Sequence, residues 1–479
     1  MTAAPRVRAT GSRLVRPRRR SRQRGSVVLI VLWAIAIAAV IMAATQLIAF
    51  RTASVGREAL ARVQARWAAR AGIEESLAVI EYHTENPDPE DQLTIYKDLE
   101  AVADGSLLSG SWSIRRTEDG VELPGPQDEG AKANVNHLQR GQLLEIPNMA
   151  FDVADSILDW RDEDSEVQSL GAERDFYINR NMPYQPRNAN FRSLAELELV
   201  AGAWPEYVRG EDANLNGRLD PNEDDGAFSA PDDNGDGLLQ AGWSALLTTY
   251  TTRSMLGGDG EPKLNLKEAT TEDLTLRFGV DEPQAAALAA YFKSANATME
   301  ALLITDLAGL AQGGTQAGGR GASGLGASTG RSSGRSGGNN SAAGGSSAVN
   351  PLSTNQLRLI FRDGTVDDLT KPAPGKVNAN TASREVLRDV LNLDDYVIDA
   401  IMNLRNGSSG GISSIVDLMG STKITPEVLA GLARDLDVAS QVFSITSRGR
   451  SVSTGLEVEI TVIVDRSVLP ARIIEYREQ

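Results

Sequence analysis

The chain has 479 residues, enough for two to four domains, so a single small module is excluded. It has no cysteine and only two histidines, which excludes disulfide scaffolds and thiolate zinc sites and argues against histidine-based metal clusters and catalytic triads. Residues 1–25 hold nine of the 48 Lys and Arg residues and no acid, so the remainder has 39 basic against 64 acidic side chains, a formal charge of −25, which argues against nucleic acid as a partner.

A basic leader, residues 1–25, precedes a long apolar segment from Ser26 to Phe50. The segment has no charged residue and is long enough as a helix to cross a hydrocarbon layer of about 30 Å. It predicts a membrane span, with the arginine-rich leader in the cytoplasm and the acidic body exported. A cleaved signal peptide is the alternative, but its apolar region usually has only about 7–15 residues.

The same helix is expected to continue beyond the membrane. From Arg51 to about His83 there is no proline, and apolar residues recur three or four positions apart, as at Leu60 and Val63. We therefore predict one helix over residues 26–83, transmembrane in its first half and amphipathic in its second half. The two prolines just beyond it are expected to end the helix.

Strands are predicted on both sides of a long central region. Residues 84–130 contain a hairpin with its turn at Asp119-Gly120, and residues 439–479 contain three strands with Gly449 and Gly455 near the turns. The middle strand alternates apolar and polar residues, as a half-buried strand does; its apolar residues are Val458, Ile460, Val462 and Val464. Because both ends of the exported body supply strands, we predict an α+β fold in which one antiparallel sheet encloses an inserted domain.

The insertion contains an internal repeat. Three segments, starting at Asn134, Asn265 and Asn378, align without gaps and keep apolar residues at offsets of 9, 20, 23 and 26. These residues are Leu143, Ala154, Ile157 and Trp160 in the first segment, Leu274, Ala285, Leu288 and Tyr291 in the second, and Leu387, Ile398, Ile401 and Leu404 in the third. Each unit is predicted to be a helix, a tight turn and a second helix, with the Asn as a helix cap. Short helices with capping boxes are predicted from Ser193 and Ser414.

Residues 131–310 hold the first two units, and residues 351–438 hold the third. Residues 311–350, between them, are rich in Gly and Ser and predict a flexible linker. Its GRGASG and GASTG strings formally match dinucleotide-binding and nucleophile-elbow patterns, but neither follows a strand or opens a helix, so both are interpreted as chance matches. No catalytic motif remains, and the chain is not predicted to be an enzyme.

An acidic insertion at residues 206–243 contains candidate metal ligands. The string DANLNGRLDPNE fits a twelve-residue calcium loop, with Gly217 at the sharp turn and ligands from Asp212, Asn214, Asn216, the Arg218 carbonyl, Asp220 and Glu223. A second, weaker copy would supply Asp232, Asn234, Asp236, the Leu238 carbonyl and Gln240. It has Trp243 at the twelfth position, so another carboxylate, from Asp224 or Asp225, would have to complete it.

A solvated acidic loop is the simpler interpretation of this region. However, ten acids lie between Glu206 and Asp236 against two arginines, and carboxylates at calcium-ligand spacing would repel one another at close range. The flanking segments are not the long paired helices of a calcium sensor. We therefore expect structural calcium that holds a long insertion with little core of its own.

The string ILDWRDEDSEVQSLGAERDFY, from Ile157 to Tyr177, carries a family resemblance. Together with the basic leader, the split sheet and the helical repeats, it resembles the type II secretion system protein K family, minor pseudopilins usually called GspK. The resemblance covers nearly the whole chain and implies a pilin-like β domain with inserted SAM-like, helix-hairpin-helix units. It also implies that prepilin peptidase cuts after Gly25 and methylates Ser26. Most pilin-like subunits have a glutamate at the fifth mature position, whereas Ile30 stands there in this chain, which suits a filament-tip subunit with no predecessor to contact.

The resemblance further implies a role in assembly. Such a subunit would nucleate the pseudopilus with other minor pseudopilins on an inner-membrane assembly platform and support secretion across the outer membrane. The secretion channel and its cargo are further implied contacts. The expected location is the inner membrane, crossed once by residues 26–50, with a cytoplasmic N-terminus and a periplasmic body.

Three alternatives stay open. A minor pilin of a type IV pilus-like system would share the leader but would not explain the DWRDED string together with the repeats. A membrane-anchored helix-hairpin-helix protein could bind DNA, but the hairpin turns have acids where Lys or Arg would be needed. A hydrolase could use Asp159, Asp162 and Asp164, although solvated acids at a helix end are commoner.

Overall fold

The computed structural model describes residues 24–118, 120–307, 349–371 and 373–479. They fall in two compact units, one ending at Leu60 and the other running from Ala61 to Gln479. One helix, α1 (Arg24–Glu85), contributes to both units. Most of the predicted leader and of the predicted Gly/Ser linker lies outside the described residues.

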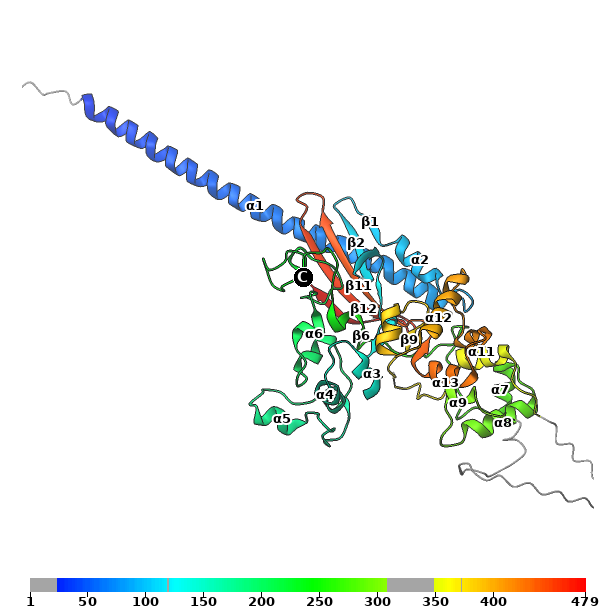
Figure 1. The fold of residues 1–479 in the computed structure, drawn as a ribbon. Coiled ribbons are helices and arrows are strands. Elements are labelled where there is room, and N and C mark those ends of the chain that lie inside the picture. Colours follow the sequence, from blue (N-terminus) through cyan, green and yellow to red (C-terminus); the bar gives the residue numbers. More distant parts are fainter. Residues whose placement is uncertain (1–23, 119, 308–348, 372) are drawn as a thin grey trace, which may run out of the picture. The chain divides into compact units, whose positions relative to one another are not determined.

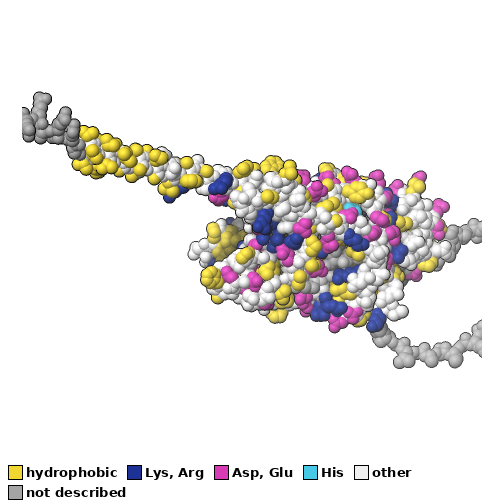
Figure 2. Space-filling view, turned by 90° about the horizontal axis from the view of Figure 1, so that it is seen from above, with side chains coloured by type: hydrophobic (Ala, Val, Ile, Leu, Met, Phe, Trp, Pro, Cys, Tyr) yellow, Lys and Arg dark blue, Asp and Glu magenta, His cyan; other side chains and the backbone are white. Residues whose placement is uncertain are grey.

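The first unit is the apolar part of α1. Every side chain from Val27 to Leu60 is exposed, and hydrophobic side chains cover this stretch of the helix in Figure 2. In the described part of the chain, α1 is the one helix whose length and composition suffice to cross a membrane, a test that a signal sequence near the N-terminus also passes. The helix is continuous through residue 50, as predicted from the sequence.

A seven-stranded antiparallel sheet forms the centre of the second unit (Figure 1). The strand order is β1-β2-β11-β12-β13, with β3 paired to β2 and β4 paired to β11. The strands are β1 (Asp104–Ser106), β2 (Gly110–Glu118), β3 (Val121–Pro124), β4 (Gln127–Asp128), β11 (Val442–Ser451), β12 (Glu457–Asp465) and β13 (Arg472–Glu478). Strands from both ends of the body therefore share one sheet, which confirms that prediction, and β2 and β3 form the predicted hairpin.

The amphipathic half of α1 packs on this sheet. Small and aliphatic residues of the helix, including Ala65, Ala69 and Ile73, share a core with Ile114 of β2 and Ile445 of β11. Helix α2 (Thr94–Ala101) adds Ile95 and Leu99 to the same core. The alternating residues predicted in the middle strand are all buried.

Gly449 corrects one expectation. It lies inside β11 opposite Trp112 of β2, and not near a turn. A Cβ atom built on Gly449 would lie 2.0 Å from the Ala65 carbonyl oxygen and 2.3 Å from the Ala69 nitrogen. The residue is a glycine because the helix backbone approaches the strand at this point, which leaves no room for a side chain. Gly455, by contrast, has φ of +73° between β11 and β12, as a turn residue can.

The inserted region contains three helix pairs in the predicted places. They are α3 (Arg140–Glu145) with α4 (Phe151–Arg161), α7 (Thr271–Phe278) with α8 (Glu282–Phe292), and η5 (Val386–Val390) with α12 (Asp395–Gly407). The first partner in the third pair is π-helical. Of the twelve repeated apolar residues, all are buried except Leu404, which is partly buried.

Each repeat begins with a short parallel strand pair that the sequence did not predict. Asn134, Asn265 and Asn378 end the strands β5 (Ala133–Asn134), β7 (Leu264–Asn265) and β9 (Val377–Asn378), which pair with β6 (Leu247–Thr248), β8 (Gly364–Thr365) and β10 (Leu436–Asp437). The side-chain oxygen of each Asn accepts the amide hydrogen two residues on. The prediction that these Asn residues are helix caps is therefore wrong. Each of them closes a turn before the helix. Thr270, five residues on in the second repeat, is the N-cap, with a capping box.

The short closing helices also differ from prediction. Both η2 (Leu194–Leu199) and η6 (Ile415–Gly420) are 3-10 helices; Ser414 forms the predicted capping box, but Ser193 does not cap through its side chain. The Glu196 amide donates to the Ser193 carbonyl oxygen, and the Glu196 carboxylate accepts hydrogen bonds from Trp160 and Arg187, so neither half of the box forms. The remaining elements are η1 (Glu129–Ala131), α5 (Arg174–Asn179), α6 (Pro205–Arg209), η3 (Pro221–Glu223), η4 (Gly242–Ala245), α9 (Met299–Leu302), α11 (Thr354–Asp363) and α13 (Pro426–Asp435).

The three repeats contribute to two separate cores. The first and third repeats share one continuous core, in which Leu143, Ile157 and Trp160 join Leu387 and Ile401. The second repeat has its own core, completed by α9 and α11. Units far apart in the sequence are therefore packed together, while the unit between them is packed separately.

Candidate functional site

The first acidic loop, residues 212–223, folds around its own polar side chains. Gly217, at the predicted sharp turn, has φ of +69°. The Asp212 carboxylate accepts the amide hydrogens of Asn216 and Gly217, and the Asn214 and Asn216 side-chain oxygens accept amide hydrogens two residues further on. The loop thus wraps around its own oxygen-bearing side chains, in the pattern that the sequence spacing predicts.

Two carboxylates of this loop are buried. Asp212 is 2% exposed and Glu223 is 1% exposed. Burial, followed by the charges of Asp212 and Asp220, raises the pKa of Glu223 to about 7, against the lowering effect of the Asp220 and Ala213 amides. Burial likewise raises the pKa of Asp212. A bound cation would stabilise the ionised form of two buried acids whose pKa values are raised by burial, so the residues present fit the predicted ion.

In the described ranges, no three Asp, Glu, His or Cys side chains already surround a common point. The predicted ligand set of the first loop mixes three carboxylates with two Asn oxygens and a backbone carbonyl. The Asn214 and Asn216 amide groups currently donate to the Asp220 carboxylate, at 2.9 Å and 3.0 Å. An ion would have to draw these side chains into its coordination shell.

The first loop is attached directly to the sheet. Thr117 of β2 donates to the Gly217 carbonyl at 2.6 Å, and Arg448 of β11 donates to the Asp220 carboxylate at 2.6 Å. The Asn216 amide donates to Glu459 of β12 at 2.9 Å. Arg218 forms a 2.8 Å ion pair with Glu122 of β3. Arg477 of β13 also donates to the Asn214 and Leu215 carbonyls. Strands of the sheet therefore hold the loop, which the sequence could not show because these partners are distant in the chain.

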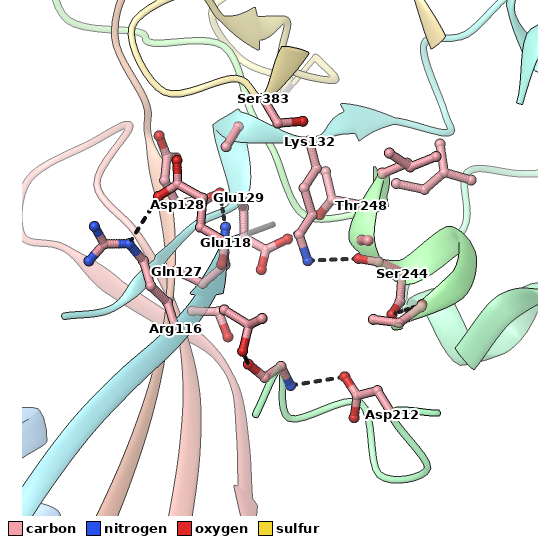
Figure 3. Close-up of a pocket in the computed structure, with 18 of the residues that line it drawn as sticks. Arg116, Glu118, Gln127, Asp128, Glu129, Lys132, Asp212, Ser244, Thr248 and Ser383 are labelled. Carbon is pink, nitrogen blue, oxygen red and sulfur yellow. Dashed lines mark hydrogen bonds and ion pairs between the residues drawn. The ribbon is translucent and has the colours of Figure 1, made fainter. Parts of the chain in front are cut away.

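A cavity of about 1060 Å³ lies next to this attachment, between the sheet and the inserted helices. Figure 3 shows Lys132, Glu129 and Thr248 on one side of it and Asp212 on another. Lys132 donates to the Ser244 carbonyl at 2.8 Å, and its charge lowers the pKa of Asp212 in part. Residues of both charge signs line the cavity, so the lining does not indicate whether a ligand would be anionic or cationic.

Asp128, also on this cavity, is a buried junction that no sequence pattern indicated. Its carboxylate accepts hydrogen bonds from Tyr96 at 2.9 Å, from Thr381 at 2.5 Å and from Ser440 at 2.7 Å. Burial raises its pKa, against the lowering effect of these hydroxyls. The residue joins α2, the sheet and the third repeat, so its role is structural.

The second acidic loop differs from its predicted ligand set at the first position. The Gly237 amide, at the sharp turn, donates to Asp224 at 2.9 Å, and not to Asp232, which is exposed. Asp233 accepts the amide hydrogens of Asp225, Gly226 and Gly235. Asn234 and Asp236 accept the amide hydrogens two residues on, as in the first loop, while Leu238 and Gln240 follow the turn. Asp224 was considered for the missing twelfth ligand, but its carboxylate accepts the amide hydrogen at the sharp turn, where a first-position residue would be expected to do so.

The acids of the DWRDED segment were expected to be solvated at a helix end. That holds for Asp164 but not for Asp159. Asp159 is fully buried in α4, and Trp160 is buried beside it, as its repeat offset predicts. Only Asp164 of the three acids is exposed. Gly25 and Ser26, the residues between which cleavage is predicted, lie at the start of α1.

Two sequence comparisons match one family. Residues 118–210, which include the DWRDED segment, match the model of the family described as type II secretion system (T2SS), protein K. The type II secretion system protein K of Pectobacterium carotovorum subsp. carotovorum is 30% identical over 205 residues, which cover 40% of this chain and 61% of that protein, less than two thirds of its length. Among solved structures, a chain of the GspK-GspI-GspJ complex from the type 2 secretion system of enterotoxigenic Escherichia coli is similar with a TM-score of 0.42 and 12% identity, covering 88% of this chain and 99% of that chain.

Proposed function

We propose that this chain is a member of the type II secretion system protein K family and acts as a minor pseudopilin at the tip of the type II secretion pseudopilus. The observation that carries the proposal is the family match across residues 118–210, joined to a continuous helix whose first part is apolar and exposed. Such a helix can lie first in lipid and later against the helices of neighbouring subunits.

The tip position follows from two features. Ile30 stands where a glutamate would contact a preceding subunit, so the subunit lacks that acceptor. The inserted repeats, which we assign to the helix-hairpin-helix class on the strength of their three helix pairs, add bulk that a packed filament has no room for. We infer that the subunit nucleates assembly with other minor pseudopilins, as the name of the E. coli complex suggests for its own chains, on an inner-membrane platform.

Processing by prepilin peptidase tests the first step of this function. Mass spectrometry of the protein from membranes should find a mature N-terminus at Ser26 carrying a methyl group. An uncleaved chain, or cleavage elsewhere, would contradict pilin-type processing. Deletion of the protein should leave exported enzymes in the periplasm while type IV pili still form; loss of pili with normal secretion would instead support the type IV pilus alternative.

We further propose that calcium is bound structurally at residues 206–243. The first loop would use Asp212, Asn214, Asn216, the Arg218 carbonyl, Asp220 and Glu223. The second would use Asn234, Asp236, the Leu238 carbonyl and Gln240, with Asp224 in place of Asp232. The two buried carboxylates of the first loop support this, because an ion would remove the repulsion between them.

The calcium proposal has a direct thermal test. Chelator should lower the melting temperature of the full-length protein in detergent, because an ion that binds only the folded state stabilises it. Glu223→Gln should remove most of that response, whereas Glu206→Gln, an exposed acid outside the loops, should keep it. Equal melting curves with and without chelator in the wild type would contradict the proposal.

A further inference from the structure

The sequence contains three Asn-Gly dipeptides, at residues 216–217, 234–235 and 406–407. An asparagine followed by a glycine can deamidate, because glycine has no side chain to hinder the attack of its backbone nitrogen on the preceding side-chain amide. The rate depends on whether the fold lets the two groups meet. The three dipeptides lie in different surroundings, so the structure distinguishes among them.

The reaction at such a dipeptide is intramolecular and needs only water as a co-reactant. The glycine nitrogen forms a bond to the asparagine side-chain carbon Cγ, the bond from Cγ to Nδ2 breaks, and ammonia leaves with the proton of the glycine nitrogen. Water then opens the resulting succinimide ring at either carbonyl, which leaves an aspartate or an isoaspartate. The attack places negative charge on the side-chain oxygen Oδ1, so a hydrogen-bond donor to that oxygen speeds the reaction.

Asn234 and Gly235, in the second acidic loop, have both reacting groups polarised. The Asp236 amide donates to the Asn234 side-chain oxygen at 2.9 Å, which is where the attack gathers negative charge. The Gly235 nitrogen donates to the Asp233 carboxylate at 2.7 Å, so a negative charge lies beside this nitrogen as the attack makes it more positive. A Cβ atom built on Gly235 would have no neighbour nearer than 3.9 Å, so the backbone here is not crowded.

The leaving group of Asn234 is unrestrained. The residue is exposed, and in the part of the chain that the structure describes its Nδ2 atom has no hydrogen-bond partner. Ammonia can therefore depart directly into solvent. The water that opens the ring can reach the same place.

Asn216 and Gly217, in the first acidic loop, share this turn but not this freedom. Gly217 has φ of +69°, close to the +62° of Gly235, and the two reacting groups again bond to a carboxylate and to the amide two residues on. However, Nδ2 of Asn216 donates to Asp220 at 3.0 Å and to Glu459 at 2.9 Å, and the residue is only 7% exposed. Both bonds to charged acceptors must break before ammonia leaves, so the fold protects this dipeptide.

The third dipeptide is protected in another way. Asn406 and Gly407 are exposed, but they are the last two residues of α12. In an α-helix each amide donates to the carbonyl four residues earlier, and side chains lean toward the helix N-terminus. The Asn406 side chain is therefore directed away from the nitrogen that would attack it, and exposure alone does not make it reactive.

We propose that Asn234 is a site of spontaneous deamidation in the folded protein, and that the fold protects Asn216 and Asn406. The product is an aspartate or an isoaspartate at position 234. Residues 219–252 contain no Lys or Arg, so the reaction adds negative charge to a segment without any basic side chain. An isoaspartate also lengthens the main chain by one carbon, which disrupts the turn that Asn234 closes.

Peptide mapping of the wild type tests this ranking. Full-length protein in detergent is incubated at neutral pH with chelator, because an ion held by Asn234 would occupy its side-chain oxygen. Trypsin then places the three dipeptides in separate peptides, residues 210–218, 219–253 and 406–423, in which mass spectrometry measures the replacement of an amide by an acid. Conversion should be faster at Asn234 than at Asn216 or Asn406 by about tenfold or more, since the loss of one charge-assisted hydrogen bond already slows a reaction by that factor.

A second incubation in urea separates the fold from the local sequence. In the unfolded chain the three dipeptides should react at similar rates, and Asn234 should react no faster there than in the folded chain. The proposal would be overturned if Asn216 or Asn406 reacted as fast as Asn234 in the folded protein. Slower conversion of Asn234 in the folded chain than in urea would also overturn it.

A pair of matched variants tests the carboxylate beside the attacking nitrogen. Asp233→Asn keeps an oxygen acceptor but removes the charge, and should slow conversion of Asn234 several-fold without changing that of Asn406. Asp232→Asn removes the same charge at the neighbouring exposed residue and should leave the rate at Asn234 unchanged. Equal rates at Asn234 in the two variants would overturn the role assigned to Asp233.

Discussion

Gly449 sets the distance between α1 and the sheet. An added methyl group there would meet the backbone of Ala65 and Ala69, which cannot rotate away as a side chain could. We expect Gly449→Ala to lower the free energy of unfolding by about 3 kcal/mol, the upper part of the range for overpacked cores. Denaturant unfolding of the protein in detergent, followed by circular dichroism, would measure it.

Gly431 provides the matched control. It is exposed in α13, and a Cβ atom built on it has no atom within 4 Å. Alanine is the better helix former, so Gly431→Ala should raise the free energy of unfolding by about 0.5–1 kcal/mol. If the two alanine substitutions had the same effect, the close approach of helix and strand would not be the reason for Gly449.

The pair of Arg140 and Asp155 predicts a pH dependence. The Arg140 guanidinium, acting against burial, holds the pKa of Asp155 below its ordinary value of 3.8. A carboxylate whose folded pKa is lowered contributes stability above its unfolded pKa, and that stability is lost as the pH falls through the folded pKa. Arg140→Gln should therefore lower the melting temperature at pH 7, and its gap to the wild type should narrow below about pH 4.

Melting curves of both proteins between pH 7 and pH 3 would check this. Arg174→Gln, at an exposed arginine of α5, is the control and should melt like the wild type throughout. A gap for Arg140→Gln that stays constant down to pH 3 would mean that the arginine acts through packing, for example on the Phe151 ring, and not through Asp155.

At the scale of elements, the three repeats offer an internal comparison. Asn265 uses its side chain mainly for the turn before α7. Asn378 makes the same turn and in addition donates to Tyr96 and Ser440, with 1% of its surface exposed. Truncation leaves these buried partners unsatisfied, so Asn378→Ala should cost about 3 kcal/mol and Asn265→Ala about 1 kcal/mol.

Denaturant unfolding of both variants would test that ranking. The comparison is matched, because the two residues occupy the same position in units of the same design. Equal losses would show that the turn alone accounts for the asparagine. A larger loss for Asn265→Ala would contradict the role assigned to the buried network around Asp128.

The attachment of the first acidic loop to four strands predicts coupling between loop and sheet. If calcium orders the loop, its removal should increase amide hydrogen exchange both at residues 212–223 and in β12. Arg448→Met removes the bond to Asp220 while keeping an apolar stem. In that variant, chelator should still loosen the loop but have less effect on β12. Identical exchange in β12 for both proteins would argue against this route of coupling.

At the scale of the whole molecule, the apolar start of α1 contributes no core to the second unit. All side chains from Val27 to Leu60 are exposed, whereas Ala61, Ala65 and Ile73 are buried. A chain that begins at Arg51 should therefore be soluble without detergent and melt at the temperature of the full chain. A chain that begins at Glu74 lacks those buried residues and should not fold, as circular dichroism would show.

Much of this architecture follows from local sequence patterns. The long helix, the sheet built from both ends and the three helix pairs were predictable because apolar periodicity reports which face of an element is buried. The wrong predictions concern residues whose role depends on contacts with parts of the chain that are distant in sequence. Gly449 was interpreted as a turn residue because no local pattern shows that the backbone of α1 lies against it. Glu196 was predicted to belong to a capping box because no local pattern shows its hydrogen bond from Trp160. The repeat asparagines close turns against strands that come from other parts of the chain.

The candidate sites show the same division. Spacing predicted a sharp turn at Gly217, which has φ of +69°, because the local turn depends only on residues within the loop. It did not show the strands that hold the loop, since Thr117, Arg448 and Glu459 are distant in the chain. Spacing did not reveal which acid enters the second loop, since Asp224 comes from outside the repeat pattern. Asp159 was considered as a candidate, but its burial and that of Glu173 were not predicted, because a charged sequence looks alike whether or not a loop closes over it.

The divided sheet has a consequence for how the protein is made. β2 ends at Glu118, but its neighbour β11 begins only at Val442. During synthesis, the apolar face of α1 and the first hairpin stay exposed until β11, β12 and β13 have been made, because these strands bury them. Pairing across such a span is slow, and surfaces left open in the meantime are prone to aggregate. Folding of each new copy is therefore completed only when the final strands pair. A chain that ends before them would lack most of the sheet and the strands to which the helical insertion is attached.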